Sequence, residues 1–308
     1  MCGIVGYSST SNSIDLSEFV SMIKSLDYRG YDSWGFTFKD KDHLTTEKQV
    51  GKIPTPTQKG NATFVIGHTR WATHGKVTED NTHPHISNSK NISLVHNGII
   101  ENYEELKNKL KKEGFTFYGE TDTEIIPNLI EFHLRNSKDI LEAFKKTLDE
   151  LEGTFAITFL HNSSNKIFFA RRDSPLVVGV DKDALIVSSD VTSFIDRTKN
   201  VIYLEDGDYG YINSEIKILN RNKEVHREIS KIDWDVDKAK KGDFKHFMLK
   251  EISEQVDTVK QSLMQDSELI TAVANRIKSS KVYIVACGSS YNAAKAAETE
   301  FLKNGIMP

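Results

Sequence analysis

Short apolar segments separated by polar turns fill the middle of the chain, and they restrict the fold more than any other feature. The segments are Phe155–Leu160, Lys166–Ala170, Leu176–Val180 and Ala184–Ser188, followed by Val201–Leu204, Tyr209–Ile212 and Glu215–Leu219. The first turns, such as Asn162-Ser163-Ser164-Asn165, are too short for a crossover connection, so neighbouring strands must run antiparallel. The pattern therefore predicts antiparallel sheet from Gly153 onward.

Helices and further strands are predicted before this region. An apolar stripe recurs at helical spacing in Asp15–Leu26 and in Ile125–Leu134, and Glu101–Lys112 is predicted to be a charged helix. Strands are predicted at Ile4–Tyr7, Trp34–Phe38, Phe64–Gly67 and Ile92–Val95. Antiparallel strands mixed with several helices predict an α+β fold built from layers of sheet and helix.

Composition fits a globular protein and excludes several classes of partner. The chain has 308 residues, of which 38% are hydrophobic and 27% charged. Its formal net charge of −4 provides no basic field for nucleic acid or a membrane surface, so we expect neither as a partner. No apolar run approaches the roughly 18–20 residues that span a bilayer, and no signal peptide is expected. The two cysteines, Cys2 and Cys287, are far apart, which favours a reducing, cytoplasmic setting over a disulfide framework.

A charged stretch without apolar periodicity, residues 231–243, is predicted to be a linker. It separates a domain of residues 2–230 from a C-terminal part of residues 244–308. In that part we expect helices at Phe247–Gln265 and Glu268–Lys278, and then a buried strand at Lys281–Ala286. One strand and one helix of a parallel sheet cannot close a core, so we expect local disorder or aggregation from about Lys281 onward.

The loop Cys287-Gly288-Ser289-Ser290 follows the predicted strand and precedes a helix expected from about Tyr291. Backbone amides and hydroxyls there could hold a phosphate at a helix N-terminus. An ordinary strand–helix turn with Ser290 as N-cap explains the same residues equally well. The spacing alone leaves both interpretations open.

Cys2 directly follows the initiator methionine, and removal of Met1 would make it the N-terminal residue. It would then carry a thiol, with an ordinary pKa of about 8.5, beside an α-amine with a pKa of about 7.7–8.0. Such an amine can accept the thiol proton, so one residue would supply both nucleophile and base. Alternatively, Cys2 is an inert structural cysteine buried at the start of an edge strand.

Three further motifs suit one small ligand, a free amino acid with a side-chain amide. Arg70 offers a bidentate fork for an α-carboxylate, and Asp122 offers a carboxylate for an α-ammonium group. Asn97 and Gly98 offer a side-chain amide and a backbone N–H to a developing oxyanion. Taken singly, each motif has a structural explanation: an ion pair for Arg70, a turn for Asn97-Gly98 and a helix cap for Asp122.

Histidines lie near these motifs, at His74, His83, His85 and His96. A zinc site is conceivable, but neither a Cys-x-x-Cys nor a His-Glu-x-x-His spacing occurs. The sequence favours loop histidines hydrogen-bonded to the backbone, and we expect neither a metal nor a cofactor.

The motifs together resemble the class II, N-terminal nucleophile (Ntn), glutamine amidotransferases, and within them the glutamine–fructose-6-phosphate aminotransferases (glucosamine-6-phosphate synthases). The resemblance runs in collinear order from Cys2 to about residue 304. It is carried by Cys2-Gly3-Ile4-Val5-Gly6, Tyr28-Arg29-Gly30-Tyr31-Asp32-Ser33, Thr69-Arg70-Trp71-Ala72-Thr73-His74-Gly75, His83-Pro84-His85, Val95-His96-Asn97-Gly98-Ile99-Ile100-Glu101-Asn102 and Glu120-Thr121-Asp122-Thr123-Glu124. At Ser253-Glu254-Gln255-Val256 the sequence departs from the family, which commonly has an aromatic residue before Glu-Gln and a proline after it.

The resemblance implies a four-layer αββα Ntn-hydrolase sandwich followed by a partial α/β sugar isomerase (SIS) domain. It also implies that Cys2 is the nucleophile and that Asn97 and Gly98 form the oxyanion hole. The implied substrate-binding residues are Arg29, Arg70, Trp71, Thr73, His74 and Asp122, and the implied sugar-phosphate-binding residues are Ser289 and Ser290.

The implied activity is hydrolysis of L-glutamine, with the ammonia passed to fructose 6-phosphate to give glucosamine 6-phosphate and glutamate in amino-sugar biosynthesis. The synthase half is incomplete in this sequence, so the glutaminase activity is what we expect from this chain. A complete protein is expected to be a homodimer. Two alternatives remain: a glutaminase domain that serves another acceptor, and a non-enzymatic remnant that binds a sugar phosphate.

Overall fold

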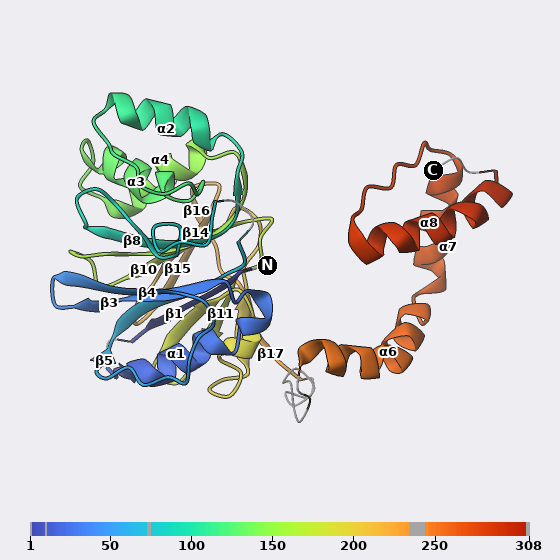
Figure 1. Cartoon of the computed structure of the whole chain (residues 1–308), viewed down its shortest axis with the longest axis horizontal. Helices are drawn as coiled ribbons and strands as arrows, with labels where there is room; N and C mark the ends of the chain where they lie inside the picture. The colour runs from blue at the N-terminus through green and yellow to red at the C-terminus, as the bar shows by residue number, and fades with distance from the viewer. Residues whose placement is uncertain (1, 10, 73–74, 234–243, 245, 306–308) are drawn as a thin grey trace. The chain divides into compact units, whose positions relative to one another are not determined.

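The computed structural model describes the chain except for residues 1, 10, 73–74, 234–243, 245 and 306–308. The chain forms two compact units, Met1–Lys240 and Lys241–Pro308, and each is described by itself (Figure 1). The boundary between them falls within the stretch expected to be a linker, residues 231–243, most of which lies outside the described residues.

The first unit contains an antiparallel sheet of eight strands in the order β17-β13-β11-β12-β1-β6-β3-β4. Its strands are β1 (Gly3–Ser8), β3 (Ser33–Asp40), β4 (His43–Val50), β6 (Phe64–Arg70), β11 (Val177–Val180), β12 (Leu185–Ser188), β13 (Asn200–Tyr203) and β17 (Ile229–Lys231). The N-terminal strand β1 lies in the middle of this sheet, between β12 and β6. Residue 2 is therefore held at the end of a central strand, not of an edge strand.

A second antiparallel sheet has seven strands in the order β16-β15-β14-β10-β9-β8-β7. Its strands are β7 (His85–Ile86), β8 (Ile92–Ile100), β9 (Gly153–His161), β10 (Ile167–Arg172), β14 (Tyr209–Ile212), β15 (Ile216–Asn220) and β16 (Lys223–Glu224). A short pair, β2 (Ile14–Asp15) and β5 (Asn61–Ala62), completes the strands of the described residues. The longest interface in this sheet joins β8 to β9, from the pair of Ile92 and His161 to the pair of Ile100 and Gly153.

Helices cover the two outer faces of this pair of sheets. Helix α1 (Leu16–Lys24) packs on the first sheet, and α2 (Tyr103–Lys112), α3 (Ile125–Leu134) and α4 (Ile140–Glu150) pack on the second (Figure 1). Two single turns of 3-10 helix, η1 (Asp27–Arg29) and η2 (Val191–Ser193), complete the unit. The two antiparallel sheets and the α+β class agree with the sequence-based prediction.

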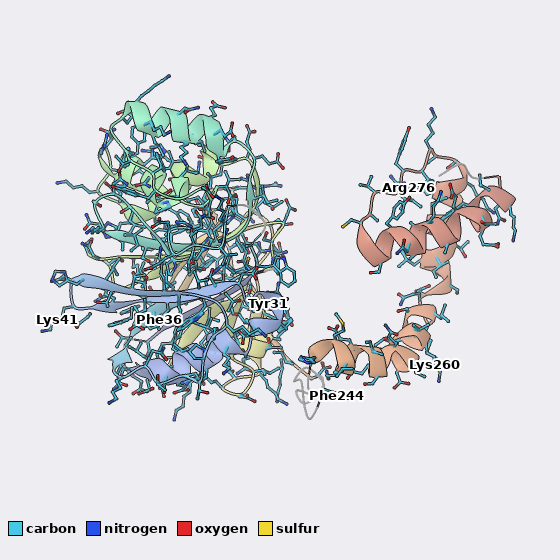
Figure 2. The ribbon with its side chains drawn as sticks, in the orientation of Figure 1. Tyr31, Phe36, Lys41, Phe244, Lys260 and Arg276 are labelled. Carbon is cyan, nitrogen blue, oxygen red and sulfur yellow. The ribbon has the colours of Figure 1, made fainter. Side chains whose placement is uncertain are left out.

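Three apolar cores separate these layers. Strand alternation sends Val5 toward α1 and sends its neighbour Ile4 into the core between the sheets. The core between the sheets also contains Ile66 of β6 and Val95 of β8, so it joins the two strands that end nearest to Cys2. Figure 2 shows Lys41 at the tip of the β3–β4 hairpin and Tyr31 at the opposite end of the sheet, where the site described below lies.

Two local predictions for the first unit are wrong. Helix α4 was not expected, although Asp139 caps it by accepting hydrogen bonds from two backbone N–H groups and its apolar residues recur at helical spacing. Asp122 does not cap α3, because the residue that precedes this helix is Glu124 and no side chain caps it. Asp122 is thus free of the structural role that the sequence offered for it.

The second unit contains α6 (Phe247–Leu263), α7 (Ser267–Lys278) and α8 (Gly288–Lys303). The strand expected at Lys281–Ala286 is absent, since residues 281–287 have no regular secondary structure. An isolated strand has no partner for its backbone groups, and no other strand lies among the described residues of this unit. The N-cap of α8 is Cys287, so the alternative interpretation in which Ser290 is the N-cap is wrong. No helix of the described residues is long and apolar enough to cross a membrane.

Candidate active site

The candidate site lies where three strands of the two sheets end together. Gly3 of β1 pairs with Thr69 of β6, so Cys2 lies beside the end of β6 at Arg70. Strand β8 of the other sheet brings Asn97 and Gly98 to the same end of the sandwich. Two central strands and the core between the sheets therefore fix the position of Cys2 relative to Asn97.

The Cys2 side chain contacts the chain just beyond β6. The Trp71 backbone N–H donates to Cys2 Sγ at 3.2 Å, and the thiol lies 3.6 Å from the Trp71 carbonyl oxygen. Burial raises the pKa of the Cys2 thiol, while the Trp71 N–H and the charges of Arg70 and Arg29 act in the opposite direction. A thiol with a raised pKa is mostly protonated at neutral pH, so it needs a base to become a nucleophile.

The Cys2 carbonyl oxygen accepts two hydrogen bonds from side chains. Arg29 Nε donates to it at 3.1 Å, and Asn97 Nδ2 donates to it at 2.9 Å. Arg29 is held in turn by an ion pair with Asp190, whose Oδ2 lies 3.0 Å from Nη1 and also accepts from the Tyr28 hydroxyl at 2.7 Å. Asp190 therefore orients the group that orients the Cys2 backbone, and no sequence pattern pointed to it.

A cavity of about 250 Å³ opens beside Cys2. Five residues singled out in the sequence line it: Cys2, Arg29, Trp71, Asn97 and Gly98. Four that were not singled out complete the lining: Ile99, Thr154, Ser174 and Pro175. The last two lie between β10 and β11, far from the motifs in sequence, and only the folding of the second sheet beside the first brings them here.

Gly98 is required by the backbone at this cavity. Its φ is +132°, a conformation that residues with a side chain rarely adopt. A Cβ at this position would lie 2.1 Å from the carbonyl oxygen of Thr154 on the paired strand β9. The close approach of β8 to β9 leaves Gly98 exposed beside Asn97, and both face the same cavity as Cys2.

Arg70 and Asp122 are buried near Cys2 but do not line the cavity. Arg70 Nη1 donates to the carbonyl oxygen of Lys76 at 3.1 Å, and Nη2 donates to that of Gly75 at 3.3 Å. Burial lowers the pKa of Arg70, and the charges of Cys2, Asp32 and Asp122 oppose this. Asp122 Oδ2 accepts from the Ile100 backbone N–H at 2.7 Å.

Trp71 is 42% exposed at the mouth of the site. Its ring packs edge-to-face against Tyr31, with 5.4 Å between the ring centroids. The next residue is anchored because the Ala72 backbone N–H donates to Asp32 Oδ2 at 2.8 Å. Thr73 and His74 lie outside the described residues.

Three of the histidines near the motifs form a buried cluster with His68 of β6. His68 stacks on His83 with ring centroids 4.1 Å apart, and His83 meets His85 edge-on at 4.7 Å. The Thr123 hydroxyl lies 2.9 Å from His96 Nδ1, so side-chain partners help to hold these rings in addition to backbone partners. Burial lowers the pKa values of all four rings. Among the described residues, no group of three or more His, Cys, Asp or Glu could hold a metal ion.

Comparison with known proteins decides the family. A family model described as "Glutamine amidotransferase domain" matches residues 68–196, a range that includes both Asn97 and Asp122. The chain carries a class II glutamine amidotransferase domain. The solved structure of the glutamine phosphoribosylpyrophosphate amidotransferase from B. subtilis, complexed with ADP and GMP, superposes on this domain with a TM-score of 0.60. It is 26% identical in sequence, over 71% of this chain and 49% of that one.

Curated relatives extend the similarity beyond the amidotransferase domain. The glutamine–fructose-6-phosphate aminotransferase (isomerizing) of Sulfurisphaera tokodaii is 38% identical over 320 residues, which is 99% of this chain and 54% of that protein. The protein of the same name from Thermococcus kodakarensis is 38% identical over 98% of this chain and 51% of its own length. That from Clostridium perfringens is 38% identical over 95% and 50%. The chain thus spans about half the length of the curated relatives it matches.

The amidotransferase domain brings together most of the predicted site residues that the structure describes. Cys2, Arg29, Trp71, Asn97 and Gly98 meet at one cavity. Arg70 and Asp122 lie behind it, within electrostatic reach of each other. The remaining predicted residues, Ser289 and Ser290, are exposed in the first turn of α8 in the second unit.

Proposed function

We propose that the amidotransferase domain is a glutaminase in which Cys2 is the nucleophile. After removal of Met1, the free α-amine of Cys2 takes the thiol proton, and Sγ attacks the side-chain amide carbon of glutamine. The C–N bond breaks, the proton passes to the leaving nitrogen and ammonia departs, which leaves a glutamyl thioester on Sγ. Water then attacks the thioester, releases glutamate and restores the thiol. The raised pKa of the Cys2 thiol supports the need for a base.

One observation carries this proposal: the Asn97 amide and Gly98 share the cavity of Cys2. Asn97 Nδ2 lies 2.9 Å from the Cys2 carbonyl oxygen, so its donor already points to this residue. In the tetrahedral intermediate, Nδ2 of Asn97 and the N–H of Gly98 would donate to the oxyanion derived from the glutamine amide oxygen. Donors fixed before the reaction stabilise charge without having to reorient as it forms.

Recognition of free glutamine is proposed for the charged groups behind the cavity. Arg70 would bind the α-carboxylate through both arms of its guanidinium, and Asp122 would bind the α-ammonium group. The two terminal guanidinium nitrogens, Nη1 and Nη2, now donate to the carbonyl oxygens of Lys76 and Gly75, so binding would exchange these contacts for the carboxylate. The other proposed pocket residues are Arg29, Trp71, Thr73 and His74.

The acceptor of the ammonia is proposed from the names of the curated relatives. We propose that the full-length protein passes ammonia to fructose 6-phosphate and forms glucosamine 6-phosphate in a reducing cytoplasm, with a homodimer as the working state. Residues 2–230 would be the glutaminase domain, residues 231–243 the linker, and residues 244–308 the start of a sugar isomerase domain. Within the last, Ser289 and Ser290 would face the sugar phosphate. A phosphoribosyl acceptor is the second candidate, because the solved neighbour at a TM-score of 0.60 is a phosphoribosylpyrophosphate amidotransferase.

The two cysteines of the chain allow a matched test of the nucleophile. Cys2→Ala is expected to abolish release of glutamate from glutamine, while Cys287→Ala, in the second unit, is expected to retain it. A diazoketone analogue of glutamine is expected to add one label to the wild type and to Cys287→Ala, and none to Cys2→Ala. Intact mass must also show that Met1 is absent. Glutaminase activity of Cys2→Ala at the wild-type rate would contradict the proposal.

The test of the ammonia acceptor uses the full-length gene product. Incubation with glutamine and fructose 6-phosphate is expected to yield glucosamine 6-phosphate in proportion to glutamate. Phosphoribosylpyrophosphate in place of the sugar is expected to yield no aminated product. The reverse pattern would favour the second candidate, and it would leave the glutaminase assignment intact.

A further inference from the structure

His68 of β6 joins the two sheets directly behind the cavity. Its side chain is fully buried, and its Nε2 lies 2.9 Å from Asn97 Oδ1 and 3.2 Å from the His96 carbonyl oxygen, both on β8. The proposed mechanism assigns His68 no role. Its contact is nevertheless with the side chain on which that mechanism depends.

The His96 carbonyl determines which nitrogen of His68 carries the proton. A carbonyl oxygen accepts hydrogen bonds and cannot donate one, so Nε2, which faces it, must be the N–H. Burial lowers the pKa of His68 to about 3, so the ring carries one proton at neutral pH. The other nitrogen, Nδ1, has no hydrogen-bond partner in the described part of the chain, as an unprotonated nitrogen allows.

The protonated Nε2 in turn fixes the orientation of the Asn97 amide. Its Oδ1 must face the His68 N–H, which leaves Nδ2 facing the Cys2 carbonyl oxygen at 2.9 Å. A rotation of the amide by 180° would place the amide NH₂ against the His68 N–H, and the amide oxygen against the Cys2 carbonyl oxygen. Both new contacts are repulsive, and the contact with the fully buried His68 side chain is shielded from water that could relieve it.

We propose that His68 is a positioning residue for the oxyanion hole: its Nε2–H holds the Asn97 amide with the NH₂ group toward Cys2. The inference rests on the proposed function, because it assigns a supporting role in the same reaction. Without the His68 donor, the amide would divide its time between two orientations, and only one of them stabilises the intermediate. Loss of this orientation is expected to lower kcat and to leave KM nearly unchanged, because the oxyanion exists only after the thiolate has attacked.

Two substitutions that introduce the same amide group test this. A glutamine side chain can place its NH₂ near the position of Nε2, whereas an asparagine amide reaches only as far as Nδ1. In the 308-residue chain, His68→Gln is expected to keep the glutaminase kcat within about threefold of wild type, and His68→Asn to lower it about tenfold or more, with little change in KM. His85→Asn is the control, since His85 belongs to the same buried cluster and bonds Thr121, not Asn97. It is expected to keep kcat within about threefold.

Thermal melts establish which variants fold. A folded His68→Asn with the wild-type kcat would overturn the inference. If His68→Asn does not fold, a folded His68→Gln whose kcat falls about tenfold or more would overturn it.

A measurement on the wild type makes the test independent of the variants. Nitrogen-15 NMR of the chain with labelled histidine is expected to show His68 as the neutral tautomer protonated on Nε2. The His68 signals are assigned by their absence from the spectrum of His68→Gln. Protonation on Nδ1 would overturn the inference. Failure of the glutaminase proposal looks different: Cys2→Ala would remain active, whatever the tautomer of His68.

Discussion

At the scale of single residues, the backbone conformation at Gly98 is the feature of the site that tolerates a side chain least. We expect Gly98→Ala to destabilise the first unit by about 3 kcal/mol or more, because a positive φ and a clash with the Thr154 carbonyl act together. Gly51→Ala is the matched control: Gly51 also has a positive φ, but no atom lies within 4 Å of its Cβ position. It is expected to cost about 1 kcal/mol. Urea melts that show equal losses would contradict the role of the clash.

A second residue-scale prediction concerns the guanidinium fork. Arg70→Lys keeps the charge but replaces two planar donors by one ammonium group, so we expect KM for glutamine to rise about tenfold or more with a smaller change in kcat. Arg172→Lys is the control, since that guanidinium also bonds backbone carbonyl oxygens, of Leu148 and Leu151, away from the cavity. An unchanged KM for Arg70→Lys would argue against the carboxylate fork.

The sequence indicated the residues of local motifs and missed those that only the fold brings in. Cys2 comes from one motif and Asn97 and Gly98 from another, and each motif is short and chemically distinctive enough to be noticed. Asp190, which pairs with Arg29, and Ser174, which lines the cavity, stand in stretches that read as ordinary turns. Their roles depend on the packing of β12 beside β1 and on the path of the chain after β10, which no local pattern encodes.

At the scale of elements, apolar periodicity predicted the helices and strands that have one buried and one solvent-exposed face. It failed for segments whose structure depends on neighbouring elements. Ile125–Leu134 is helix α3 with the bounds expected from its apolar stripe. Lys281–Ala286 has the composition of a buried strand but forms none, because a strand is stable only beside another strand. Of the histidines expected in loops, His85 and His96 lie instead in strands β7 and β8, whereas His83 lies outside any strand; all three are buried.

Asp27, the first residue of η1, predicts how the stability of the chain depends on pH. Burial raises the pKa of Asp27 to about 6, and its Oδ1 has no partner among the described residues. The folded state thus binds this proton more tightly than the unfolded state, whose pKa is about 3.9, so the group favours folding below about pH 4. That contribution is lost as the pH rises through about 6, and the buried carboxylate is then unfavourable.

Asp27→Asn should therefore stabilise the chain at pH 8, by about 1 kcal/mol after allowance for partial exposure, and have no effect at pH 4. Asp42→Asn, in the exposed turn between β3 and β4, is the control and is expected to have no effect at either pH. Thermal melts at the two pH values measure the difference. An equal effect of Asp27→Asn at pH 4 and pH 8 would show that the ionisation is not responsible.

At the scale of the whole molecule, the candidate site and the cores that hold it belong to one unit. The residues that line the cavity beside Cys2 all lie within Met1–Lys240, and so do the members of all three apolar cores. The core beneath α1 extends as far as Ile232, just after the last strand β17. Within the described residues, the cores of the first unit therefore reach no further than residue 232.

This limit predicts that a chain ending at residue 233 folds and hydrolyses glutamine by itself. Its kcat and KM should lie within about threefold of those of the 308-residue chain, because no atom of the proposed reaction has been removed. A chain ending at residue 228 is the matched control. It loses β17 and the side chain of Ile232, which is 3% exposed, so it should unfold with a free energy lower by about 2–5 kcal/mol. If the chain ending at residue 233 melts as the longer chain does but releases no glutamate, the glutaminase depends on residues 234–308. The proposed site would then be incomplete within the first unit.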